Sequence, residues 1–202
     1  MMRNNKLIFT IFIFLSFYQP YSLGKEMPIV LLVLGSERKK RMAEPLSKAI
    51  AALVDKSKVN LRIVDLQEYA LPFIDLQNPQ RDENMKRWAR EVQDADALIL
   101  LIPNYNDGYS ATIKNAIDVL VDEGKNKIAG LISYAGGYGS TNPITSLSPC
   151  LKSIGIEPLA DSYVVIPFIS SVLTGDNTFK KNEVSDEIKK MLLNMYKKLG
   201  VA

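Results

Sequence analysis

The chain has 202 residues, of which 25 are basic, 22 are acidic and 47% are hydrophobic, a composition typical of a globular domain rather than a disordered chain. It contains no histidine and a single cysteine, Cys150. These counts exclude Ser-His-Asp and Cys-His catalysis, histidine-ligated metals, an intrachain disulfide and a thiolate metal cluster. The near-neutral charge offers no broad basic surface, so we expect no nucleic-acid partner.

Residues 1–26 support two interpretations. A basic start precedes an apolar run at residues 7–18, which is too short for a comfortable membrane span, and residues 22–24 offer plausible cleavage positions. This order is typical of a secretory signal peptide. Met27, however, directly precedes the next apolar run, so translation from Met27 would give a complete domain without a leader. We therefore interpret residues 1–26 as a signal peptide or a non-native N-terminal extension, and residues 27–202 as one domain.

From residue 29 onward, apolar runs alternate with amphipathic segments. Five strands alternating with helices predict an α/β fold, a three-layer sandwich with a five-stranded parallel sheet. Ligands of such sheets bind beyond the carboxyl ends of the strands, so we expect the site in the loops that follow them. The predicted strands are residues 29–34, 59–66, 97–102, 127–134 and 163–167, and the predicted helices are residues 43–56, 82–94, a segment starting after Ser110, 142–154 and 182–199.

The basic loop, residues 35–41, follows the first predicted strand. It offers a serine hydroxyl, backbone N–H groups and four basic side chains near a helix N-terminus, which together are what a phosphate group needs. A solvated surface turn is the alternative. The chain lacks the G-x-x-x-x-G-K-[ST] motif, and no G-x-G-x-x-G follows the first strand. A mononucleotide therefore fits better than the ligands of P-loop or Rossmann sites.

The amide loop, residues 104–109, follows the third predicted strand, which ends at Pro103. It carries two asparagines, two tyrosines and a glycine, and Ser110 then offers an N-cap to a helix with an apolar face. A buried strand, a polar loop and a helix in this order are typical of a ligand site in an open α/β sheet. A plain connection without a ligand is the alternative.

The glycine loop, residues 133–140, follows the fourth predicted strand and reads S-Y-A-G-G-Y-G-S. Its three glycines let the main chain approach a flat ring closely and present amide groups to the ring's polar edge. By itself such a segment is often only a flexible turn. Its position after a neighbouring strand predicts that it meets the other two loops at one ligand.

These three loops resemble those of the NADPH-dependent FMN reductase family, whose members are flavodoxin-like proteins. The family segment P-E-Y-N-x-G-Y-P-A-x-L-K-N-A-I-D resembles residues 103–118, with departures at Asn104, where the family usually has Glu, and at Ser110, where it often has Pro. The basic loop resembles the family's G-S-x-R-x-x-[SR] loop, with Arg41 where many members have Ser, and the glycine loop resembles its S-Y-x-G-G-x-G turn. The matches in the first segment are Pro103, Tyr105, Asn106, Gly108, Tyr109, Ala111, Lys114, Asn115, Ala116, Ile117 and Asp118.

The resemblance implies a flavodoxin-like enzyme that binds FMN and uses NADPH or NADH as co-substrate. The flavin carries the redox chemistry in such an enzyme, so we expect no catalytic side chain and no metal. A small-molecule acceptor such as free flavin, a quinone or an azo compound, and a homodimer or homotetramer, are expected. The implied cofactor-binding residues are Ser36, Arg38 and Arg41 at the phosphate, Tyr105 and Asn106 flanking the isoalloxazine, Gly136, Gly137 and Tyr138 at its polar edge, and Gly35, Pro103, Asn104 and Ala135 beside them.

Two other functions stay open at this stage. One is an FMN electron-transfer protein reduced by a protein partner, although such flavodoxins are usually strongly acidic and this chain is near neutral. The other is a flavin-free domain that kept the fold, for which the departure at Asn104 leaves room. Because NADPH is kept in the cytoplasm, we expect a cytoplasmic enzyme; an exported or periplasmic protein is the alternative if the leader is functional.

Overall fold

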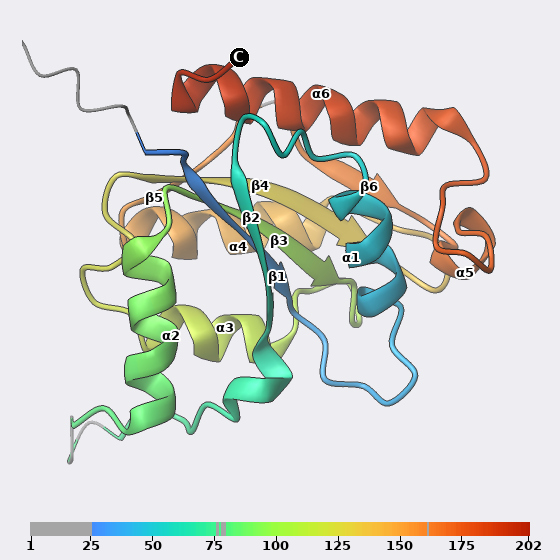
Figure 1. Cartoon of the computed structure of the whole chain (residues 1–202). Coiled ribbons are helices and arrows are strands. Elements are labelled where there is room, and N and C mark those ends of the chain that lie inside the picture. Colours follow the sequence, from blue (N-terminus) through green and yellow to red (C-terminus); the bar gives the residue numbers. More distant parts are fainter. Residues whose placement is uncertain (1–25, 76, 78–79, 161) are drawn as a thin grey trace, which may run out of the picture.

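The computed structural model describes residues 26–75, 77, 80–160 and 162–202, so the interpretations of residues 1–26 concern a segment almost wholly outside the described residues. The described chain forms one parallel sheet between two layers of helices, as Figure 1 shows. The predicted three-layer α/β sandwich of flavodoxin-like order is therefore confirmed.

The sheet has the strand order β2-β1-β3-β4-β5, with β6 also on β4, and every pairing is parallel. The fifth position is shared, because β5 pairs with the start of β4 and β6 pairs with its end. The predicted strand at residues 163–167 is β6, whereas β5 was not predicted; Pro158 at its end has no N–H to extend the ladder. The strands are β1 (Ile29–Leu34), β2 (Asn60–Asp65), β3 (Ala97–Pro103), β4 (Lys127–Tyr134), β5 (Ile156–Pro158) and β6 (Val164–Ile166).

Helices cover both faces of this sheet (Figure 1). On one face lie α1 (Ala43–Ala51), α5 (Ile169–Val172) and α6 (Asn182–Leu199), and on the other lie α2 (Glu83–Asp94), α3 (Ala111–Asp118) and α4 (Asn142–Ser153). A short 3-10 helix, η1 (Leu66–Tyr69), follows β2. None of the helices in the described residues is long and apolar enough to cross a membrane.

Helix α1 ends earlier than the predicted residue 56. The Asp55 side chain accepts hydrogen bonds from the Ser57 backbone N–H at 3.0 Å and from the Ser57 hydroxyl at 2.6 Å. Such a local side-chain turn competes with the helical hydrogen bonds of the same segment. The amphipathic pattern therefore continues beyond the point where the backbone leaves the helix.

Strand β3 lies at the centre of the core. All seven of its residues are buried, as a parallel strand covered by helices on both faces requires. Its Ile99 and Leu101 belong to the apolar cluster under α1 and α6, and its Leu98 and Leu100 belong to the cluster under α2, α3 and α4. These two clusters fix the strand ends, and hence the starts of the three loops.

Ser110 ties the end of β1 to the start of α3. Its buried hydroxyl accepts from the Ile113 N–H at 3.2 Å, which confirms the predicted N-cap, and donates to the Gly35 carbonyl at 2.5 Å. Gly35 must be a glycine here, because a Cβ would lie 2.2 Å from Ile113 Cδ1 and 2.8 Å from the Leu101 carbonyl oxygen. The basic loop and the amide loop thus begin side by side.

Candidate functional site

A cavity of about 180 Å³ lies at the carboxyl ends of β1, β3 and β4, which are neighbours in the sheet. It far exceeds the roughly 10–15 Å³ that one water molecule needs. All three loops contribute to its wall, so their predicted convergence is confirmed. Four of the lining side chains are cationic and none is acidic, which suits an anion. The lining residues are Ser36, Arg38, Lys39, Lys40, Arg41, Met42, Pro103, Asn104, Tyr105, Tyr134, Ala135, Gly136 and Ile169.

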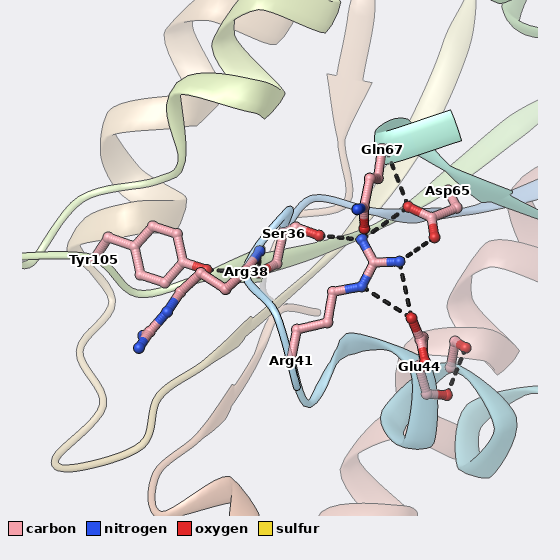
Figure 2. A network of polar contacts seen from close by, with 8 residues as sticks. Ser36, Arg38, Arg41, Glu44, Asp65, Gln67 and Tyr105 are labelled. Carbon is pink, nitrogen blue, oxygen red and sulfur yellow. Dashed lines mark hydrogen bonds and ion pairs between the residues drawn. The ribbon is translucent and has the colours of Figure 1, made fainter. Parts of the chain in front are cut away.

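Arg41 is held by two carboxylates and a carbonyl group, as Figure 2 shows. Its Nη1 and Nη2 pair with the two carboxylate oxygens of Asp65, and Nη1 also donates to the Ser36 carbonyl. Nε and Nη2 donate to Glu44 Oε1 at 3.2 and 2.9 Å. Burial alone would lower the Arg41 pKa, but the hydrogen bonds and charges of Asp65 and Glu44 raise it overall.

These contacts decide what Arg41 can do. A guanidinium group has five N–H donors, and the five contacts of Arg41 occupy all of them. The structure therefore gives Arg41 the task of fixing the course of the basic loop, and it leaves no N–H for the direct phosphate contact that the sequence predicts. Asp65, at the end of β2, is the residue that captures it.

Ser36 joins the basic loop to the amide loop. Its hydroxyl lies 2.6 Å from the Tyr105 hydroxyl. The Arg38 guanidinium lies over the Tyr105 ring, 5.7 Å from the ring centroid, and points away from the Arg41 contacts (Figure 2). Arg38 is therefore the arginine of this loop whose charge can meet an anion in the cavity.

A tight turn shapes the amide loop. Tyr105 and Gly108 exchange both backbone hydrogen bonds, with N···O distances of 2.9 and 3.0 Å. Between them, Asn106 and Asp107 have positive φ angles of 49° and 64°, as in the type I′ turn of a two-residue hairpin. Asn and Asp are the non-glycine residues that best tolerate this conformation.

Asp107 fastens this turn to the glycine loop and to α4. Its carboxylate accepts from the Ser140 hydroxyl and from the Asn142 amide, and these hydrogen bonds lower the Asp107 pKa. Asn104 bridges the same groups, because its Nδ2 donates to Ser140 Oγ at 3.2 Å and its Oδ1 accepts from the Asp107 N–H at 3.1 Å. An ionised Glu could only accept. Asn in place of the family's Glu thus serves as donor and acceptor at once.

Backbone contacts hold the glycine loop. The Ala135 N–H donates to the Ile166 carbonyl, the Ile169 N–H donates to the Ala135 carbonyl, and the Phe168 N–H donates to the Gly137 carbonyl, each at 2.9 Å. A Cβ at Gly136 or Gly137 would meet no described atom within 4 Å.

Neither of these two glycines has a positive φ angle. Packing and backbone conformation therefore do not require glycine at either position. A ligand that approaches the main chain closely would require it.

The structure brings most of the predicted site residues together. Four of them belong to the same loops but do not line the cavity, namely Gly35, Asn106, Gly137 and Tyr138. Tyr138 is 89% exposed, and its ring packs edge-on against Phe168 with the centroids 4.9 Å apart. The predicted residues that line the cavity are Ser36, Arg38, Arg41, Pro103, Asn104, Tyr105, Ala135 and Gly136.

Sequence reasoning missed four residues of the site outside the basic loop. One of them, Met42, directly follows that loop and lines the cavity. Tyr134 ends β4 and lines the cavity, and Ile169 reaches it from a fourth strand end, after β6. Asp65 holds Arg41 from the end of β2. An acidic residue at the carboxyl end of a predicted parallel strand was the one signal available for Asp65. Tyr134 lies in the S-Y-x-G-G-x-G turn but was not among the predicted binding residues, and no motif marks Ile169.

The model of the NADPH-dependent FMN reductase family matches residues 27–170. The chain belongs to this family. It is 28% identical over 178 residues to an NAD(P)H-dependent FMN reductase of Saccharomyces cerevisiae, covering 80% of this chain and 93% of the yeast protein. It is 31% identical over 159 residues to an FMN-dependent NADPH-azoreductase of Staphylococcus aureus, covering 76% of this chain and 80% of that protein. The flavoenzyme NAD(P)H:(acceptor) oxidoreductase FerB of Paracoccus denitrificans shares the fold, with a TM-score of 0.74 at 20% identity over 86% of this chain and 97% of FerB.

Family membership makes this chain an FMN-dependent oxidoreductase with NAD(P)H as co-substrate. The residues present fit FMN. The cationic wall of the cavity suits the phosphate, and the open main chain at Gly136 and Gly137 suits a flat ring. The family reading also accounts for the two motifs, G-S-x-R and G-G-x-G, lying at one edge of the sheet.

Proposed function

We propose that this chain oxidises NADPH or NADH and passes the reducing equivalents to a small-molecule acceptor such as free flavin, a quinone or an azo compound. The observation that carries the proposal is the junction of two unlike surfaces, the cationic cavity and the open main chain of the glycine loop. A ligand with an anionic end and a flat end fits both surfaces, whereas a simple anion would need only the first. FMN supplies the redox chemistry when bound.

Each loop has its own task in this proposal. Ser36, Arg38 and the backbone N–H groups of the basic loop hold the phosphate, while Arg41 keeps the loop in shape through Asp65. Tyr105 and Asn106 flank the ring. No side chain has to act as a nucleophile or general base, which suits a chain without histidine.

An exposed aromatic pair supports a flat acceptor. Tyr138 and Phe168 are 89% and 41% exposed, and the Phe168 N–H fixes the pair to the glycine loop through the Gly137 carbonyl. Aromatic side chains pack well against flat apolar rings, whether face to face or edge-on. Quinones and azo compounds offer such rings, as does free flavin.

Absorbance and turnover of the full-length protein test the proposal together. We expect flavin absorbance in the purified protein, identification of the released flavin as FMN, and oxidation of NADPH or NADH that speeds up when free FMN, a quinone or an azo dye is added. Bound FMN without NAD(P)H oxidation would instead identify an electron carrier reduced by a partner protein. Absence of any flavin, together with failure to bind added FMN, would indicate a flavin-free domain.

We also propose that the enzyme is a homodimer or homotetramer and works in the cytoplasm, where NADPH is kept. Light scattering of the purified protein measures the assembly. N-terminal sequencing of the protein from its own host tests the location: a chain beginning at Met27 or Pro28 supports the cytoplasm. A chain beginning near Lys25 in an exported fraction contradicts it and favours another electron donor.

A further inference from the structure

Tyr134 carries a buried hydroxyl for which the described residues provide no hydrogen-bond partner. The residue is 6% exposed and ends β4, and it lines the cavity. Ser133 Oγ is the other buried side-chain atom of this kind in the described chain, but Ser133 does not line the cavity. Burying an unpartnered hydroxyl is unfavourable, so its placement here calls for a hydrogen bond that forms when the ligand binds.

The groups around this hydroxyl belong to the anion site. Burial raises the Tyr134 pKa well above its usual value, and the neighbouring Tyr105 adds to the rise, while Ser36, Arg41 and Arg38 oppose it. The phenol therefore keeps its proton at neutral pH and can donate a hydrogen bond. Ser36 lies near enough to affect this pKa, yet the two hydroxyls do not have the geometry of a hydrogen bond.

Ser36 is the group through which Tyr134 can act. A serine hydroxyl has one proton and two lone pairs. In the 2.6 Å contact between Ser36 and Tyr105, either hydroxyl can donate. If Ser36 donates to Tyr105, it has no proton left for a phosphate. If tyrosine hydroxyls fill both lone pairs of Ser36, its proton is directed to the cavity.

Resting on the proposed FMN binding, we propose that Tyr134 is a positioning residue of the phosphate site. Its hydroxyl donates to Ser36 Oγ while Ser36 donates to the phosphate, and Tyr105 fills the second lone pair. In this arrangement, the cluster of Tyr134, Ser36 and Tyr105 offers the ligand only a hydrogen-bond donor, and so does Arg38. A phosphate dianion only accepts, so it fits, whereas the terminal hydroxyl of riboflavin also needs an acceptor for its proton. The arrangement therefore selects FMN over riboflavin.

The test compares the affinities of the flavin-free, full-length protein for FMN and riboflavin by fluorescence quenching. We expect Tyr134→Phe to raise the Kd for FMN about tenfold, the effect of losing one hydrogen bond in a charged site, and to leave the Kd for riboflavin unchanged. Equal losses for the two flavins, or no change for FMN, would overturn the proposal.

Tyr196→Phe is the matched control. Tyr196 is also 6% exposed, but its hydroxyl has a partner, the Asp55 N–H at 3.0 Å, far from the site in sequence and structure. We expect Tyr196→Phe to lower the urea midpoint of unfolding and to leave the FMN-to-riboflavin ratio unchanged. Tyr134→Phe should not lower the midpoint of the flavin-free protein, since no hydrogen bond is lost.

A double-mutant cycle with Ser36→Ala identifies the route. If Tyr134 acts through Ser36, Tyr134→Phe has no further effect on the FMN-to-riboflavin ratio in the Ser36→Ala background; an equal effect in both backgrounds would overturn the Ser36 route. Should Tyr134→Phe fail to fold, 3-fluorotyrosine at position 134, a stronger donor of nearly the same size, should tighten FMN relative to riboflavin, and an unchanged ratio contradicts the proposal. A wild-type protein that binds no FMN overturns the proposed function as well, whereas normal FMN-dependent turnover with an unchanged ratio overturns this inference alone.

Discussion

The basic loop and the glycine loop line the same cavity but keep their shapes by opposite means. Side chains hold the basic loop. The single side chain of Arg41 makes five contacts, which go to Asp65, Glu44 and the Ser36 carbonyl. The main chain holds the glycine loop at Ala135 and Gly137, and the space above Gly136 and Gly137 is open. At one end of the site, the charge of Arg41 is paired with carboxylates, and at the other end, glycines leave the main chain uncovered. Substitutions that remove the Arg41 contacts should therefore act on folding, and substitutions that fill the space above the two glycines should act on the ligand.

The largest effect on FMN binding is expected in the glycine loop. Gly137→Val would fill the open space next to the main chain and keep a flat ring from approaching, so the FMN affinity should fall about a hundredfold, the equivalent of a severe steric clash. Since a Cβ there meets no described atom within 4 Å, the urea midpoint should not fall. Flavin titration and urea unfolding of the same preparation check both statements.

Gly35→Ala is the opposite case and serves as control. Its Cβ would lie 2.8 Å from the Leu101 carbonyl oxygen, which belongs to the backbone of a buried strand. We expect a loss of about 1–3 kcal/mol in unfolding free energy, as for other overpacked core positions. A stable Gly35→Ala protein, or an unstable Gly137→Val protein, would remove the distinction between the two loops.

The two arginines of the basic loop should separate folding from binding. Arg41→Ala leaves the Asp65 carboxylate, whose side chain is 17% exposed, without its cation, so we expect a loss of about 2–4 kcal/mol in stability. Arg38→Ala should leave stability unchanged and lower the FMN affinity about tenfold, as expected for a lost charge-assisted contact. Replacing both arginines should produce both losses.

Asp65→Asn provides the decisive control for Arg41. In the Arg41→Ala background it removes the unpaired charge, and its Oδ1 can still accept from the Gln67 N–H, as the Asp65 carboxylate does at 3.0 Å. Part of the lost stability should therefore return. If Arg41→Ala instead keeps full stability and loses FMN as Arg38→Ala does, Arg41 contacts the phosphate after all.

The sequence was informative where local chemistry decides the structure. Apolar runs marked most strands of the sheet, and Ser110 marked the start of α3. Each of these signals lies within a few residues of the feature that it predicts. They sufficed for the sheet and for the convergence of the three loops.

Long-range pairing was beyond the sequence. Arg41 looks like a phosphate ligand in its loop, but its partner Asp65 lies 24 residues away, and the competition between a ligand and a carboxylate is visible only in three dimensions. Tyr134 belongs to the S-Y-x-G-G-x-G turn, but the sequence does not show that its hydroxyl is buried without a partner, because burial and not residue type decides this. Strand β5 has three residues with the charged Glu157 at its centre, whereas the equally short β6 is continuously apolar and was therefore predicted.

The smallest effect is expected where the two kinds of loop are joined, at Asp107. Hydrogen bonds from Ser140 and Asn142 hold the Asp107 pKa below its usual value. A lowered pKa in the folded state means that this link is complete above the ordinary aspartate pKa, about 3.9, and is lost as the pH falls through the lowered value. The FMN affinity should therefore fall at acid pH, and part of this fall should depend on protonation of the Asp107 carboxylate.

Asp107→Asn should weaken FMN about threefold at neutral pH, the effect of one modest hydrogen bond, and should abolish this part of the acid dependence. Asp176→Asn is the matched control, because hydrogen bonds from Thr174 and Thr178 lower the pKa of Asp176 in the same way in a different loop. FMN titrations of the wild type and both variants between pH 3 and pH 7 separate the carboxylate from the titration of the phosphate, which all three proteins share. An acid loss that is the same in Asp107→Asn as in the wild type would show that Asp107 does not couple the amide loop to the glycine loop, and that the open main chain keeps its place through the backbone alone.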